Sequence, residues 1–142
     1  MSVSPFDSAL YRDLFTDTDI ARLFTDSAEI RAMMLVEGAL AKAQGALGLI
    51  PQDSAEAIHR AAMEVQIDPS GLAAATGQNG VPVPALVAAF RAAMDAPEHA
   101  QYLHWGATSQ DIIDTGLVLR LRQALSLMET TQTQMLDALA TM

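Results

Sequence analysis

The segment HWGATSQDIIDTG, residues 104–116, decides how the rest of the sequence is interpreted. It is a polar turn containing glycine that runs directly into a helical pattern. Thr108 and Ser109 are favourable N-cap residues, and Asp111 and Asp114 place carboxylates near the positive end of the helix dipole. The segment therefore predicts a helix with a well-defined start.

The same turn concentrates hydrogen-bond donors. The N–H groups at a helix start lack partners within the helix and readily hold an anion. Two hydroxyls, the amide of Gln110 and the imidazole of His104 lie beside them in the chain, and the imidazole could donate to a carboxylate or exchange a proton. The donors predict a site for a small carboxylate. The alternative is a capped helix whose histidine only supports the turn.

Downstream of the turn, apolar residues recur at helical spacing as far as Leu139. None of the glycine, asparagine or proline signals that usually end a helix comes before Met142. We therefore expect one long helix, and we expect the chain to be the amino-terminal piece of a longer protein.

Upstream of the turn, the patterns predict an all-α domain of shorter helices. The first extends from about 27 to 47, between a capping pair at Asp26 and Glu29 and a glycine at 48, and its mainly apolar face also carries Glu37 and Gln44. Residues 1–25 are expected to be irregular, with a short helical turn at 20–24. Further helices are expected to begin at Asp53 with Glu56, at Pro69 and at Pro84, with a loop at 77–80 and a connector at 95–103.

The composition excludes several functional classes. The chain has 142 residues, 51% of them hydrophobic, which suits one folded domain. Its net charge of −9 repels phosphate, so we expect no nucleic-acid partner. It shows neither a signal peptide nor a long apolar run, so we expect no membrane association. The absence of cysteine excludes disulfide and thiolate chemistry and fits a cytoplasmic protein.

The histidines do not predict a metal site. His59, His99 and His104 lack the spacing of two ligands on one helix, and no carboxylate cluster completes a site. His59 is expected at a solvated helix position. The glycines at 77 and 80 lack the lysine and preceding strand of a phosphate loop, and Ser109 lacks a nucleophile-elbow pattern.

Residues 104–116 resemble the first signature region of the fumarase/aspartase superfamily, in particular its carboxymuconate cycloisomerase branch, and segments 16–20, 40–51 and 81–87 also resemble that family. The resemblance implies an enzyme without a cofactor that acts on a small di- or tricarboxylate. It also implies a helical first domain at residues 1–110, the first part of a central long-helix bundle at 111–142, and assembly into a homotetramer.

For the branch, the implied reaction is closure of 3-carboxy-cis,cis-muconate to a carboxymuconolactone in protocatechuate breakdown. The substrate-binding residues carried over by position are Thr108 and Ser109 for a carboxylate, His104 in contact with the substrate, Gln110 in support and, more weakly, Asn79. The family's proton-transfer residues belong to later signature regions that the sequence does not contain. We therefore expect the catalytic groups beyond Met142 and expect the chain to be inactive by itself.

Two alternatives remain open. Adenylosuccinate lyase shares a His-aromatic-Gly-x-Thr-Ser pattern, but it must hold a phosphate and usually has a His-Asp pair where this chain has residues 79–84; the missing pair and the few cations count against it. The other alternative is a non-enzymatic helical module. In that case the apolar positions after Leu117 would bind partner helices and the polar turn would only cap the helix.

Overall fold

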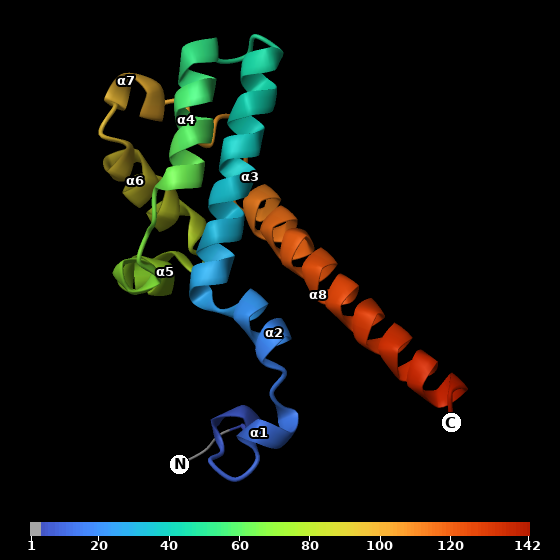
Figure 1. Ribbon diagram of the computed structural model, residues 1–142. Coiled ribbons are helices and arrows are strands. Elements are labelled where there is room, and N and C mark those ends of the chain that lie inside the picture. Colours follow the sequence, from blue (N-terminus) through green and yellow to red (C-terminus); the bar gives the residue numbers. More distant parts are fainter. Residues whose placement is uncertain (1–3) are drawn as a thin grey trace.

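Two long helices organise the computed structural model, which describes residues 4–142 (Figure 1). Helix α3 spans Asp26–Ala46 and helix α8 spans Ser109–Ala140. The described residues contain no strand, so the predicted all-α class is confirmed. The expectation for residues 1–3 lies outside the described part. The shorter elements are η1 (Pro5–Asp7), α1 (Arg12–Phe15), α2 (Thr18–Ala21), η2 (Arg22–Phe24), α4 (Gln52–Glu64), η3 (Pro69–Leu72), α5 (Ala73–Asn79), α6 (Val83–Met94) and α7 (Pro97–Ala100).

Helix α3 lies close to its predicted position, with one correction at its start. The N-cap is Thr25, whose hydroxyl accepts a hydrogen bond from the N–H of Ala28, and Asp26 already lies in the first turn. The helix ends at Ala46 with Leu47 as its C-cap, and Gly48 terminates it as predicted, with a φ of 71° that suits glycine because that residue has no Cβ. The N–H of Leu49 closes the end by donating to the carbonyl of Gln44 at 2.9 Å.

Helices α3 and α4 pack antiparallel at close range (Figure 1). Small residues allow this approach: a Cβ on Gly38 would lie 2.6 Å from that of Ala62, and one on Gly45 would clash with Ala55. His59 faces Gly38 and is half-buried, so the expectation that it is solvated is wrong.

The middle helices begin at or after a proline, in one case with an aspartate as N-cap, and the predicted capping pair is not used. The pair at Asp53 and Glu56 does not cap α4, which has Pro51 at its N-cap without a side-chain hydrogen bond. Pro69 and Pro84 do lie in first turns, as predicted. The loop predicted at 77–80 is wrong in part, because α5 continues through Asn79 and only the residue after it leaves the helix. The connector 95–103 contains the short helix α7.

The hydrophobic core lies where α3, α4, α6 and the first half of α8 meet. Its largest fully buried side chains include Phe90, Met33, Met34 and Ile58, so both methionines of α3 are core residues. The second half of α8 projects away from this domain (Figure 1). None of the helices described at 4–142 is long and apolar enough to cross a membrane.

Candidate functional site

The predicted polar turn connects α7 to α8, and its backbone is bent by two residues in the left-handed region. His104 has a φ of 63° and Gly106 a φ of 69°. A positive φ is common for glycine but uncommon for other residues, and histidine is among the residues enriched there. The bend turns the chain into Thr108, the N-cap of α8, as the sequence predicts.

Three side chains from the domain hold three successive residues of this turn. Glu37 Oε1 of α3 lies 2.6 Å from Nδ1 of His104. Gln44, also from α3, donates to the carbonyl of Trp105 at 2.6 Å. The guanidinium of Arg91 in α6 donates to the carbonyl of Leu103 at 2.8 Å. The turn is therefore fixed to the domain on both sides of the histidine ring.

Glu37 is the most deeply buried charged side chain of this site, with 1% of its surface exposed. Burial raises its pKa above the ordinary value of 4.5, while the hydrogen bond with His104 and the positive charge of Arg91 oppose that shift. Its second oxygen, Oε2, is buried without a hydrogen-bond partner among the described residues. A buried carboxylate of this kind needs a good partner, and His104 supplies it.

At the start of α8, two of the predicted donors are engaged within the helix. The N–H and the hydroxyl of Thr108 donate to Asp111 at 2.8 and 3.0 Å, and these bonds lower the pKa of Asp111 below its ordinary value of 3.8. The amide of Gln110 donates to Asp114 at 2.5 Å. Ser109 is half-buried, and its hydroxyl makes no hydrogen bond to the described residues.

The fifth predicted residue, Asn79, lies apart from the turn in the chain's architecture. It is exposed at the end of α5, which packs on η3 and α6. Within residues 4–142, no hydrogen bond joins its side chain to the turn. The structure therefore groups four of the predicted residues and leaves the fifth on another element.

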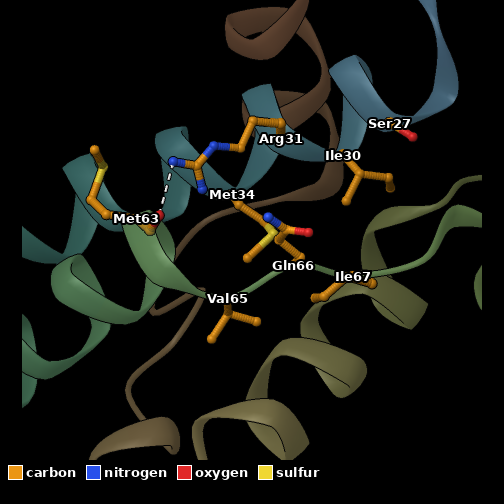
Figure 2. A pocket seen from close by; sticks show the side chains of 8 residues that line it. All are labelled: Ser27, Ile30, Arg31, Met34, Met63, Val65, Gln66 and Ile67. Atoms are coloured by element: carbon orange, nitrogen blue, oxygen red, sulfur yellow. Dashed lines mark hydrogen bonds between the residues drawn. The ribbon is translucent and has the colours of Figure 1, made fainter.

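A cavity of about 380 Å³ between α3 and the end of α4 contains an arginine but is not a promising anion site (Figure 2). Its guanidinium, from Arg31, donates to the carbonyls of Ala62 and Met63 at 2.5 and 3.2 Å. These carbonyls belong to the C-terminal turn of α4, where a cation is stabilising. The arginine is thus occupied in capping a helix.

Reasoning from the sequence missed Glu37, Gln44 and Arg91 as residues of the site. The available signal was the position of Glu37 and Gln44 on the mainly apolar face of their helix, where polar groups must find partners. No comparable signal marks Arg91, because its contact with residue 103 depends on how α6 packs.

A family model described as lyase matches residues 9–142 of the chain. The chain therefore belongs to this family, the lyases of the fumarase/aspartase superfamily. The all-α fold described above agrees with that assignment.

Individual relatives show which enzymes of this family the chain resembles. The 3-carboxy-cis,cis-muconate cycloisomerase of Acinetobacter baylyi is 43% identical over 126 residues, covering 86% of this chain and 28% of that protein. The crystal structure of beta-carboxy-cis,cis-muconate cycloisomerase from Acinetobacter calcoaceticus sp. ADP1 matches with a TM-score of 0.82 at 41% identity, over 88% of this chain and 30% of that one. Adenylosuccinate lyase of Methanocaldococcus jannaschii is 31% identical, over 98% of this chain and 29% of that protein. The chain thus spans less than a third of each of these relatives.

Proposed function

We propose that the chain supplies the first substrate-binding segment of a 3-carboxy-cis,cis-muconate cycloisomerase. The observation that carries the proposal is the turn at 104–109, where an anchored imidazole and an unengaged serine hydroxyl lie at the start of a long helix. Relatives named for this reaction at 43% and 38% identity support the same choice. The reaction needs no cofactor.

The chemistry would use the turn to stabilise developing negative charge. One carboxylate oxygen of the substrate forms a C–O bond to a carbon of the internal double bond. The electron pair of that double bond moves to the neighbouring carbon and into its own carboxylate, which becomes an aci-carboxylate. A general acid then protonates the carbon, so the product is an isomer of the substrate. Hydrogen bonds that strengthen as the charge builds lower the barrier.

In this proposal Thr108 and Ser109 hold the substrate carboxylate, His104 contacts the substrate and Gln110 supports it. Thr108 then exchanges Asp111 for the substrate, because its hydroxyl donates to that side chain in the present structure. Asn79 remains a weaker candidate on a separate element.

We further propose that the working enzyme is a homo-oligomer completed by segments outside this chain. The support is a row of large apolar side chains on α8 that are exposed here, which in water favours association. They are Leu117, Val118, Leu121, Leu125, Met128, Met135, Leu136 and Leu139. The proton-transfer groups would come from the other segments, so the chain alone should not turn over carboxymuconate. The division at residue 110 also remains a prediction.

A chimera tests the proposal, with this chain replacing the matching segment of the Acinetobacter baylyi cycloisomerase. We expect the chimera to convert 3-carboxy-cis,cis-muconate, and the double variant T108A/S109A to lose about 100-fold or more in kcat, the effect typical of removing donors to an oxyanion. T133A is the matched control, since that hydroxyl is exposed and bonds only to the carbonyl of Glu129.

Equal kcat values for T108A/S109A and T133A would remove the turn from the mechanism. The assay also decides between the alternatives. Turnover of adenylosuccinate in place of carboxymuconate would favour the lyase to which the chain is 31% identical. A chimera that assembles but converts neither compound would favour a helical oligomerisation module.

A further inference from the structure

Glu37 has no role in the chemistry proposed above, yet its carboxylate lies 2.6 Å from the ring of His104. We propose that Glu37 is a positioning residue, whose buried carboxylate keeps the hydrogen of His104 on Nδ1 and thereby leaves Nε2, the ring nitrogen not in contact with Glu37, as the reactive nitrogen. The catalytic meaning of this inference rests on the proposed function, but its structural part can be tested separately.

The chemistry of the contact determines which ring nitrogen carries the hydrogen. When Glu37 is ionised, its carboxylate can only accept hydrogen bonds, so the ring nitrogen 2.6 Å away is then the donor. In the neutral ring, Nε2 is then the nitrogen with the lone pair; in the charged ring, Nε2 carries a hydrogen of its own. A carboxylate that fixes a histidine in this way is a common means of setting its tautomer and orientation.

The pair formed by Glu37 and His104 is largely buried. The side chain of Glu37 is 1% exposed and that of His104 is 19% exposed, so water competes weakly for the contact on the glutamate side. Removing the histidine would leave a buried charge without its partner, which is costly. The positive charge of Arg91 from α6 favours the ionised form of Glu37.

The backbone at His104 also holds the ring in place. His104 is held at a φ of 63°, a conformation that persists in a non-glycine residue when its surroundings enforce it. Here Gln44 and Arg91 fix the carbonyls of the residues on either side. With both neighbours fixed, the backbone at residue 104 holds the Cα–Cβ bond of the histidine in one direction, and the contact with Glu37 then sets the orientation of the ring.

A purely structural anchor would account for the same contacts, so the test must read the ring itself. Uniformly ¹⁵N-labelled chain, residues 1–142, is titrated by NMR to about pH 9, where an ordinary histidine is neutral. The ring ¹⁵N shifts of His104 are expected to show a single tautomer with hydrogen on Nδ1. A ring with hydrogen on Nε2 in the unaltered chain overturns the proposal, whether or not any variant folds.

The variant E37Q sharpens this measurement. Its amide can offer Nδ1 either an acceptor or a donor, so the ring should lose its confinement to one tautomer. E29Q is the matched control on the same helix, because Glu29 is half-exposed and pairs with Arg120 instead. Retention of the single Nδ1–H tautomer in E37Q, with unchanged circular dichroism, also overturns the proposal.

The chimera separates this inference from the proposed function. In an active chimera, E37Q should lower kcat by about 10- to 100-fold, the usual cost of removing a group that orients a functional histidine, and should change KM less. Full kcat in E37Q would refute the positioning role and leave the function intact. An inactive chimera whose His104 still shows one Nδ1–H tautomer would refute the function and leave the geometric inference standing.

Discussion

The two halves of helix α8 both carry apolar residues at helical spacing, but their surroundings differ. In the first half, every fourth residue is buried on one stripe, formed by Ile112, Gly116, Arg120 and Ala124. In the second half, leucines and methionines recur at helical spacing on both sides of a polar stretch at 129–134, yet Leu136 is 63% exposed whereas Ile112 is 1% exposed. The first half lies against α3, and the second extends beyond it (Figure 1).

The difference teaches that burial here depends on the partner that is present. A glycine lets the first half approach closely: a Cβ on Gly116 would lie 3.3 Å from the side chain of Met33. Beyond residue 124 the described chain offers no second helix of that kind, so the apolar side chains remain at the surface. Their regular spacing is nevertheless that of a helix whose apolar face packs on another surface.

The largest expected effect comes from truncating one residue in each half. We expect I112A to lower the free energy of unfolding by about 2–5 kcal/mol, because a buried methylene-rich side chain leaves a cavity. L136A should change it by about 0.5 kcal/mol or less, as is usual for exposed positions. Denaturant unfolding of dilute chain measures both. Equal losses would show that the second half is covered in solution.

A smaller effect is expected at the boundary between the halves. Arg120 is buried. Its Nη2 lies 3.5 Å from Oε2 of Glu29, and its guanidinium carbon lies 5.7 Å from the centre of the Phe24 ring. We expect R120M to cost about 1–2 kcal/mol, the range of a partly desolvated cation–π contact together with a partly exposed ion pair. R122M is the control, since Arg122 is exposed on the same helix. An equal stability for the two variants would contradict the packing role of Arg120.

The smallest effect concerns the start of the first half and depends on pH. The hydrogen bonds from Thr108 lower the pKa of Asp111. This carboxylate therefore stabilises the fold at pH values above its ordinary pKa of 3.8, and it loses that contribution as the pH falls through the lowered pKa. We expect D111N to have a lower melting temperature than the unaltered chain at pH 7 and a smaller difference near pH 2. Thermal melts at both pH values check this, with D137N as an exposed control. A difference that grows on acidification would reverse the assigned sign.

Much of the fold could be predicted because local signals determined it. Proline in a first turn located two helix starts, and Gly48 located the end of α3. Predictions failed where a signal had a close competitor: Thr25 caps α3 in place of the neighbouring aspartate, and α5 continues through a sequence typical of a turn. Helix ends depend on one or two hydrogen bonds, which neighbouring residues can supply equally well.

The candidate site also has one part that the local sequence predicted and one part that it did not. The segment that contains Thr108 and Ser109 is contiguous, so its sequence revealed the capped helix start and the family resemblance. Glu37 is 67 residues away from His104 in the chain, and only packing brings the two together. Without that contact, His104 could be identified as a candidate but its orientation could not.

By itself the sequence determined an all-helical chain, a polar, capped helix start and membership of a lyase family. These properties follow from residues that are close together in the chain, where spacing and side-chain chemistry are sufficient. Only the tertiary structure decided which half of α8 is covered and which carboxylate faces the histidine. Both depend on the position of α3, and a contact between distant segments exists only once the chain has folded and removed the contacting groups from water.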